Sequence, residues 1–457
     1  MFGKLLIANR GEVAVRIART CERMGIATVA VHSEVEGEAL HVQACDEAVA
    51  IGPAAVRESY LNAEAIIEAA RARGAEAIHP GYGMLSENHS FARAVADAGL
   101  VFVGPPPEAL ERFGDKLRAR QVASQAGVRA IPGTETAVDS LEQARDQAED
   151  IGYPLLVKAS AGGGGIGMQR VDDEDDLEAA LERARERAES AFGDGRVYLE
   201  HCIDQPRHVE VQVLADANGE CVALGERECS VQRRHQKILE ESPAPALEAL
   251  HNGELKRRIL WDSAIRIAKE GGYVNAGTAE FLMDVRGRFY FMEFNPRLQV
   301  EHAVTELCTG LDIVELQLQI AAGEALPNEA RTVAPAGHAI EARVYAEDPH
   351  KGFIPKPGKI ETMRWPTVAP GALRVETGAA AGSEVTSHYD PLVAKFITYH
   401  PTRHQALLTL DRVLAETTIA PLTTNLTFLR QILADESFRA GQYDTDFTAR
   451  LLAQLKG

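Results

Sequence analysis

The sequence predicts an α/β protein made of several compact units. In the first hundred residues, short apolar runs alternate with segments whose apolar positions recur every three or four residues, which is typical of a parallel sheet covered by helices. From His208 onward, apolar and polar residues alternate, which is typical of half-buried strands. The length of 457 residues corresponds to roughly three domains of about 100–200 residues each.

The N-terminal unit is predicted to begin with a strand at residues 5–8. The helix that follows has its apolar residues on one face and ends at Gly25, because glycine adopts the left-handed conformation of a helix C-terminus easily. Further strands are expected at 28–31, 77–79 and 100–103, and further helices at 63–73 and 90–98. The turn after the first strand reads Asn9-Arg10-Gly11-Glu12, and its single glycine and its acid disfavour a dinucleotide-binding fold.

In the middle of the chain, the sequence pattern predicts a small α/β subdomain inserted between larger units. A helical segment containing Lys116 lies between the loops 105–107 and 131–133. After it we expect a helix at 141–149, a strand at 155–158, a glycine loop, a helix at 176–190 and a strand at 196–200. Strands are expected at 209–214, 278–283 and 289–294, a linker at 326–337, and then strands at 339–345, 373–376 and 393–399 with a helix at 404–415.

The composition excludes several classes of protein. The chain has 48 basic and 67 acidic residues, a net charge of −19, which argues against non-specific binding to nucleic acid or to an anionic membrane. Its six cysteines are widely spread and form no C-x-x-C pair, so we expect reduced thiols. Since no secretory signal or long apolar segment is evident, the sequence predicts a cytoplasmic protein.

A glycine-rich loop is the most conspicuous local motif. Lys158 ends a predicted strand and is followed by Ala-Ser-Ala-Gly-Gly-Gly-Gly-Ile-Gly-Met. Consecutive glycines let backbone N–H groups converge on an anion, and the nearby lysine favours a nucleotide phosphate over a simple flexible turn. The loop lacks the Lys-Ser/Thr pair of the phosphate loop motif. We therefore expect a nucleotide-binding loop of a different type.

A cationic stretch stands out against the acidic background. Between Arg227 and Lys237 there are four cations (Arg227, Arg233, Arg234, Lys237) and one acid (Glu228), which gives a local charge of +3. Such a stretch is often only a solvated face of the protein. In a chain of net charge −19, it is also the best candidate for binding a small anion.

Two neighbouring strand candidates carry acidic side chains. Alternation on residues 289–295 places Phe289, Phe291, Glu293 and Asn295 on one face. If this strand pairs with 278–282 as a hairpin, Glu280 lies beside Glu293. Carboxylate and amide oxygens suit Mg²⁺ or Mn²⁺ bound to nucleotide phosphates, although two exposed acids on an edge strand are the simpler alternative. The next residues, 295–302, add an arginine and another acid, which favours the metal site.

These motifs together resemble the biotin carboxylase family of ATP-grasp ligases. The matching segments are 7–12, 79–83, 86–88, 114–116, 158–168, 232–237, 295–302 and 341–343. The resemblance implies an ATP-grasp fold with an N-terminal parallel-sheet domain at 1–112, an ATP-grasp domain at 113–330 and a C-terminal α+β domain at 331–457. A small mobile lid subdomain is expected at about 131–204.

The resemblance also implies an activity. It is the ATP-dependent carboxylation of biotin on a biotin carboxyl carrier protein, with bicarbonate activated as carboxyphosphate. This is the first half-reaction of acetyl-CoA or acyl-CoA carboxylase, in fatty acid biosynthesis. No methionine is followed by lysine, so the biotin-attachment motif Ala-Met-Lys-Met is absent and the biotin is expected on a partner. Carboxyltransferase subunits and a second copy of the chain are the other expected partners.

Roles for individual residues follow from the same resemblance. The residues expected to bind cofactor and substrates are Lys116, Lys158, Gly164, Gly165, Glu200, Ile203, His208, His235, Glu280 and Val300. Two metal ions, Mg²⁺ or Mn²⁺, are expected on Glu280, Glu293 and Asn295. The expected catalytic residues are Lys237, Arg297, Glu301 and Arg343, with Glu301 as the base on bicarbonate and Arg343 facing biotin. Because all substrates are anions, we expect a locally cationic pocket formed by Lys116, Lys158, Arg233, Lys237, Arg297 and Arg343.

Two other classes of protein are alternatives to a biotin carboxylase. Another ATP-grasp ligase, joining a carboxylate to an amine or thiol, would share the lysines, the glycine loop and the metal acids, but would not need the segments 232–237 and 295–302. A non-catalytic scaffold of the same fold would not need Lys237, Glu301 and Arg343, which are all present. One departure from the family is Ile166, where an arginine or lysine is common, and it predicts a raised KM for ATP.

Overall fold

The computed structural model describes residues 1–161 and 168–455. Gly164, Gly165 and Ile166 lie outside the described residues. The N-terminal unit is a five-stranded parallel sheet with the strand order β3-β2-β1-β4-β5. Its strands are β1 (Lys4–Ile7), β2 (Ala27–His32), β3 (Glu47–Ala50), β4 (Ala77–His79) and β5 (Val101–Phe102), and its main helices are α1 (Gly11–Met24), α3 (Ala63–Ala72) and α4 (His89–Asp97). The predicted alternation of strands and helices is confirmed.

Helix α1 illustrates why the local pattern predicts this unit well. Val13, Ala14, Ile17 and Cys21 form one apolar face that is buried against the sheet. Gly25 ends the helix with φ of 70°, and its N–H donates to the carbonyls of the last turn. The apolar spacing and the glycine stop are thus sufficient to define both the face and the end of the helix.

The lid subdomain contains a three-stranded antiparallel sheet of order β7-β6-β8, covered by two helices. Its elements are α7 (Leu141–Ile151), β6 (Leu155–Ala159), β7 (Gln169–Val171), α8 (Leu177–Phe192) and β8 (Val197–His201). The single helical segment expected around Lys116 is two helices, α5 (Pro107–Gly114) and α6 (Lys116–Gln125). They separate at Asp115, whose carboxylate accepts hydrogen bonds from the first N–H groups of α6 and so begins a new helix.

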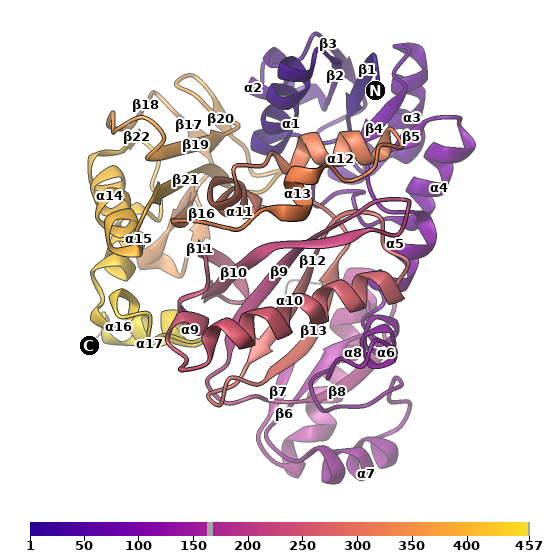
Figure 1. Cartoon of the computed structure of the whole chain (residues 1–457), viewed down its shortest axis with the longest axis vertical. Coiled ribbons are helices and arrows are strands. Elements are labelled where there is room, and N and C mark those ends of the chain that lie inside the picture. Colours follow the sequence, from indigo (N-terminus) through magenta and orange to yellow (C-terminus); the bar gives the residue numbers. More distant parts are fainter. Residues whose placement is uncertain (162–167, 456–457) are drawn as a thin grey trace.

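An eight-stranded antiparallel sheet of order β13-β12-β9-β10-β11-β14-β21-β19 forms the centre of the molecule (Figure 1). Its strands are β9 (Arg207–Ala215), β10 (Cys221–Arg233), β11 (Gln236–Ser242), β12 (Asn275–Met283), β13 (Phe289–Asn295), β14 (His338–Tyr345), β19 (Leu373–Thr377) and β21 (Leu392–His400). The expected linker at 326–337 contains a short helix, α13 (Asn328–Thr332). This segment does not divide the sheet, because β14 pairs directly with β11.

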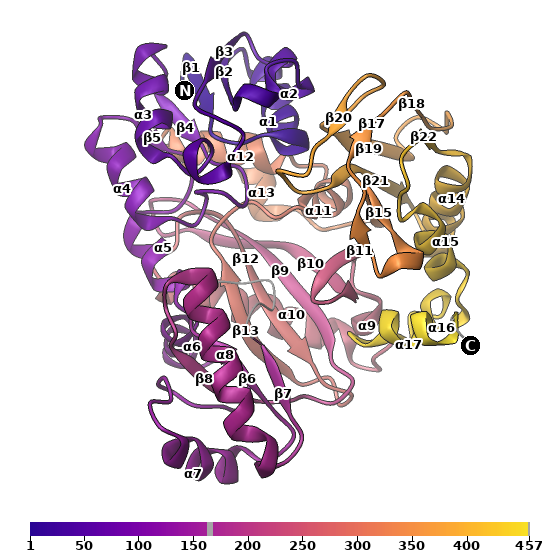
Figure 2. The same ribbon diagram turned by 180° about the vertical axis from the view of Figure 1, so that it is seen from behind.

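Helices cover the central sheet and connect it to the other units. The longer ones are α10 (Gly253–Glu270), α11 (His302–Thr309), α12 (Ile313–Ala321), α14 (Arg403–Glu416), α15 (Leu426–Ala434) and α17 (Phe447–Gln454). Shorter elements are α2 (Leu40–Gln43), α9 (Pro245–Glu248), α16 (Glu436–Arg439), β15 (Glu347–Asp348), β16 (Ile354–Pro355), β17 (Gly358–Lys359), β18 (Thr362–Arg364), β20 (Glu384–Val385) and β22 (Thr418–Ala420). In Figures 1 and 2 the N-terminal unit lies at the top, the lid subdomain at the bottom and the C-terminal helices at one side of the sheet. Among the described helices, none combines the length and apolarity needed to cross a membrane.

The alternation along β9 positions the site. Val209, Val211 and Val213 are fully buried in the core that includes α10. His208 and Glu210 alternate with these valines, so they lie on the opposite face of the sheet. The apolar face therefore anchors the strand while the polar face is directed to the cavity described next.

Candidate active site

A cavity of about 2370 Å³ lies between the N-terminal unit, the lid subdomain and the central sheet. The predicted cofactor, metal and catalytic residues that the structure describes line it: Lys116, Lys158, Glu200, Ile203, His208, His235, Lys237, Glu280, Glu293, Asn295, Arg297, Val300, Glu301 and Arg343. The predicted residues Gly164 and Gly165 lie in the segment 162–167, outside the described part of the chain. Residues from every unit of the fold thus meet at one site.

Lys237 on β11 lies among three buried carboxylates. Its Nζ is 2.6 Å from Glu210 Oε2, 2.9 Å from Glu280 Oε1 and 2.7 Å from Glu301 Oε1. Burial alone would lower the pKa of Lys237, but these three negative charges raise the pKa well above its ordinary value. The ammonium is therefore permanently charged and joins the two strands β9 and β12 to the start of α11.

Glu301 is held from two sides. Besides Lys237, it contacts Arg343, whose Nη2 lies 2.9 Å from Glu301 Oε2 and 2.5 Å from Glu240 Oε1. Burial would raise the pKa of Glu301, but the positive charges of Lys237 and Arg343 outweigh burial and hold the pKa well below its usual range. Glu301 is therefore an ionised carboxylate at the wall of the cavity.

Glu240 and Glu341 form a second carboxylate pair behind Arg343. They are directly opposite each other on β11 and β14, and both are fully buried. Burial raises the pKa of Glu240 to about 7 and raises that of Glu341 well above its ordinary value. Since like charges in such a position repel, each of the two carboxylates disfavours the ionised form of the other.

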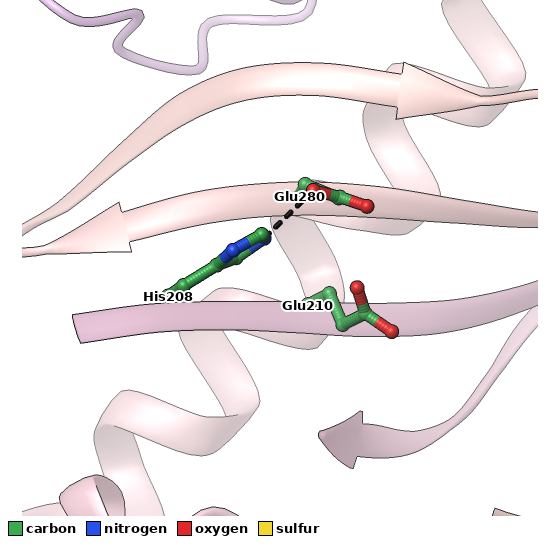
Figure 3. Close-up of side chains that lie close together, drawn as sticks. All are labelled: His208, Glu210 and Glu280. Atoms are coloured by element: carbon green, nitrogen blue, oxygen red, sulfur yellow. Dashed lines mark ion pairs between the residues drawn. The ribbon is translucent and has the colours of Figure 1, made fainter. Parts of the chain in front are cut away.

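Figure 3 shows how three side chains converge across the sheet. His208 and Glu210 project from β9 toward Glu280 on β12, and Glu280 lies opposite Glu210 in the register. His208 Nε2 is 2.7 Å from Glu280 Oε2. The predicted residues His208 and Glu280 are thus in direct contact, and the alternation on β9 places Glu210 beside them.

Strands β12 and β13 form the expected hairpin, with Glu280 opposite Glu293. The expectation that Phe289, Phe291, Glu293 and Asn295 share one face is wrong. The register moves from Glu280–Glu293 to Phe281–Phe291, so one extra residue on β13 forms a bulge and reverses the alternation. As a result Phe289 and Phe291 pack in the core, while Glu293 and Asn295 line the cavity.

The donor set of the hairpin suits a divalent metal ion. Two carboxylates, Glu280 and Glu293, and the amide of Asn295 line the same part of the cavity, and these oxygens are hard ligands of the kind that Mg²⁺ prefers. Glu293 Oε2 lies 3.4 Å from the ammonium of Lys116, and Asn295 Nδ2 lies 2.5 Å from Glu280 Oε1. Rotation of the Asn295 amide would present its oxygen instead. The residues therefore fit the predicted ions.

Lys158 and Glu200 form an ion pair on adjacent strands of the lid subdomain, β6 and β8. Arg120 from α6 also reaches Glu200, with Nη1 2.6 Å from Oε1. Glu200 is fully buried, so its charge is balanced by the two cations. The contact between Arg120 and Glu200 ties the base of the lid to the helix that begins at Lys116.

The sequences and folds of known proteins agree with this arrangement. The model for the biotin carboxylase N-terminal domain matches residues 1–110, that for the carbamoyl-phosphate synthase L chain ATP binding domain matches 115–329, and that for the biotin carboxylase C-terminal domain matches 341–450. Biotin carboxylase 2 of Bacillus subtilis (strain 168) is 49% identical over 447 residues, which are 98% of the chain and 99% of that relative. The chain belongs to the biotin carboxylase family. It is an ATP-dependent ligase that carboxylates biotin.

Other members of the biotin carboxylase family extend the comparison. Methylcrotonoyl-CoA carboxylase subunit alpha of Dictyostelium discoideum is 47% identical over 97% of the chain and 63% of that relative. The biotin carboxylase domain dimer of Hydrogenobacter thermophilus 2-oxoglutarate carboxylase, in complex with MgADP, ADP and bicarbonate, has a TM-score of 0.94 at 42% identity and covers 99% of both chains. The biotin carboxylase of Campylobacter jejuni, in a β-γ-ATP complex, has a TM-score of 0.94 at 43% identity, over 98% of this chain and 99% of that one.

We expected Arg233 to help form the cationic pocket, and this expectation is wrong, because Arg233 does not line the cavity. Arg233 Nη2 lies 2.8 Å from Glu347, and its guanidinium stacks over the ring of Phe353. Arg227, from the same cationic stretch, is fully buried and bonds to Glu210 and polar residues around it. Two of the four cations thus neutralise internal acids, because a buried charge needs a partner. The other two cations of the stretch, Arg234 and Lys237, line the cavity.

Sequence reasoning missed several residues of the biotin carboxylase site. Glu210 had a visible signal, because it alternates with the valines of β9 together with His208. Glu87, whose Oε1 lies 2.5 Å from Arg297 Nε, belongs to the segment 86–88, for which the sequence indicates no role. Glu240 had no local signal, since its importance depends on Arg343, which is far away in the sequence.

Proposed function

We propose that the chain carboxylates biotin borne by a biotin carboxyl carrier protein, using bicarbonate activated by ATP as carboxyphosphate. The reaction is the first half-reaction of acetyl-CoA or acyl-CoA carboxylase, in fatty acid biosynthesis. The single observation that carries the proposal is Glu301, an ionised carboxylate placed between Lys237 and Arg343 in a cavity that also contains Lys116 and Lys158. This arrangement provides a base together with cations for a small anion and for nucleotide phosphates.

The first step joins bicarbonate to the γ-phosphate of ATP. Bicarbonate binds to Lys237 and Arg297, and its negative charge weakens the contact between Lys237 and Glu301. Glu301 then becomes a better base and takes the bicarbonate proton, while a bicarbonate oxygen attacks phosphorus and ADP leaves. Lys116 and Lys158 offset charge on the phosphates, and Ile203, His208 and His235 complete the nucleotide pocket. Glu280, Glu293 and Asn295 would hold two Mg²⁺ or Mn²⁺ ions, which neutralise phosphate charge.

The second step transfers the carboxyl group. Carboxyphosphate releases CO₂ and phosphate, and the phosphate takes the ureido N–H proton of biotin. The biotin nitrogen then attacks CO₂, while Arg343 stabilises the negative charge on the ureido oxygen. The location of Arg343 beside Glu301 supports both steps taking place in one cavity, because the group that deprotonates bicarbonate and the group that steadies biotin are 2.9 Å apart. Closure of the lid subdomain would exclude water from carboxyphosphate.

The wider assembly is part of the same proposal. We propose a cytoplasmic homodimer that works with a carrier protein and carboxyltransferase subunits, and a division into domains at 1–112, 113–330 and 331–457, with the lid at about 131–204. The dimer of the Hydrogenobacter thermophilus domain supports the oligomeric state. Sedimentation of the purified chain, alone and mixed with a biotinylated carrier, tests both associations.

The decisive assay measures ATP hydrolysis. The proposal requires that hydrolysis depends on bicarbonate and rises when biotin is added. Stimulation by an amino acid or a thiol, with no effect of biotin, would instead identify another ATP-grasp ligase that joins a carboxylate to an amine or thiol.

A further inference from the structure

Lys395 on β21 is a fully buried lysine that contacts the loop before α11. Its Nζ donates a hydrogen bond of 2.7 Å to the carbonyl oxygen of Val300, the residue before Glu301. The same Nζ lies 2.7 Å from Glu376 Oε2 and 3.1 Å from Glu12 Oε1. The side chain is 0% exposed, and Lys395 is absent from the described residues that line the cavity. It therefore touches the site only through other groups.

The contacts of Lys395 come from three parts of the fold. Glu12 lies in the first turn of α1, Val300 precedes α11, and Glu376 lies opposite Lys395 on the neighbouring strand β19. Glu12 also accepts a hydrogen bond from the hydroxyl of Tyr82, which lines the cavity. One ammonium thus fixes the N-terminal unit, the central loop and the C-terminal strands relative to one another.

The Val300 contact bears directly on Glu301. A peptide carbonyl and the next residue share one rigid plane, so fixing the Val300 oxygen fixes the backbone from which the Glu301 side chain projects. The charges on Lys237 and Arg343 hold the two carboxylate oxygens, and Lys395 holds the backbone behind them. A base whose backbone and carboxylate are both held needs little reorganisation when bicarbonate arrives.

We propose that Lys395 is a positioning residue for the carboxylation reaction, acting through the Val300 carbonyl on the orientation of Glu301. This inference rests on the proposed role of Glu301 as the base on bicarbonate. Its ammonium is suited to the task, because the ion pairs with Glu12 and Glu376 keep it charged and fix it in place. Of the three contacts of Lys395, the hydrogen bond to the Val300 carbonyl is therefore the one that affects turnover.

The test compares two variants of the full chain with a matched control. Lys395→Met removes the hydrogen bond to Val300, and Lys395→Met combined with Glu12→Gln also removes one of the carboxylates left without a partner. The control is Arg374→Met, because Arg374 pairs with the same Glu376 and with Glu306, at 2.7 Å, and leaves the Lys395–Val300 bond in place. Calorimetric titration with ADP counts the folded sites, and bicarbonate-dependent ATP turnover is expressed per site.

The expected result is a loss of about tenfold to 100-fold in kcat per site for both Lys395 variants, with the KM for ATP unchanged. The control is expected to lose thermal stability while its kcat per site stays that of the wild-type chain. Wild-type kcat per site in the double variant would overturn the inference, as would an equal loss of kcat in the control. A wild-type chain without any bicarbonate-dependent turnover would instead overturn the proposed function, and the role of Lys395 with it.

Discussion

Arg343 Nη2 lies 2.9 Å from Glu301 Oε2, so the residue proposed to face biotin touches the residue proposed to act on bicarbonate. The two come from separate parts of the chain, β14 and the start of α11. Their contact means that a change in one alters the charge felt by the other.

Replacing Glu301 with glutamine is expected to abolish most turnover. The amide keeps the size of the side chain but cannot accept the bicarbonate proton, so bicarbonate-dependent ATP hydrolysis should fall by about 100-fold or more. ADP binding, measured by calorimetry, should stay close to that of the wild-type chain. Glu306→Gln is the control, because Glu306 lies on the same helix but pairs with Arg16 at 2.8 Å. An active Glu301→Gln variant would reject Glu301 as the base.

Removal of divalent metal should stop the reaction. Chelation with EDTA is expected to halt ATP hydrolysis, and added Mg²⁺ to restore it. Glu293→Gln should raise the Mg²⁺ concentration needed for half-maximal turnover by about tenfold or more, because one oxygen ligand loses its charge. Glu254→Gln is a suitable control, since Glu254 is an exposed residue that pairs with Arg257 on α10. An unchanged Mg²⁺ requirement in Glu293→Gln would exclude Glu293 from the metal site.

Ile166→Arg should lower the KM for ATP. An arginine in the glycine loop would add a positive charge where the family commonly has one, and phosphate attracts a guanidinium strongly. Ile166 lies outside the described residues, so this prediction rests on the sequence. Steady-state kinetics at varied ATP concentration measure the effect, with Ile166→Leu as the neutral control. A KM that is the same in all three chains would contradict the prediction.

The contribution of His41 to stability should fall as the pH drops from 7 to 5. This residue is fully buried, and burial lowers its pKa from the ordinary value of 6.5 to about 4. Between these two values the unfolded chain binds a proton at His41 and the folded chain does not. His41 therefore lowers the free energy of unfolding toward acid, by roughly 2 kcal/mol between pH 7 and pH 5.

Denaturant unfolding at pH 7 and pH 5 measures this loss. His41→Gln cannot titrate, so the difference in stability between the two pH values should shrink by the share of His41. His79 and His302, which burial also shifts to pKa values of about 3 and about 4, contribute in the same direction as His41, whereas Glu240, whose pKa burial raises to about 7, contributes in the opposite direction. A variant with the full wild-type difference would show that His41 is not responsible.

Local sequence patterns predict some parts of this molecule well. Strand β4 lies at the expected residues, and α1 ends at the expected glycine, because each depends on apolar spacing within a short segment. The motifs also identify residues that meet in the cavity, such as Glu280 and Glu293, since a hairpin brings neighbouring strands together.

Other features depend on contacts between distant segments. Strands β10 and β11 were not predicted, because charged residues such as Arg227 and Lys237 occupy positions that are usually apolar in strands. Their burial is possible only because glutamates from other strands neutralise them. The bulge in β13 and the bond between Lys395 and Val300 also leave no mark in the local sequence.

The pairing of β11 with β14 has a consequence for the integrity of the chain. A protease that cuts between residues 326 and 337 breaks the covalent connection, but the hydrogen bonds from Leu239 to Ser242 with Ala339 to Ala342 remain. The two fragments should therefore stay together during gel filtration and separate only in denaturant. The nicked protein would also keep Arg343 beside Glu301, so that proteolysis at this loop need not inactivate it.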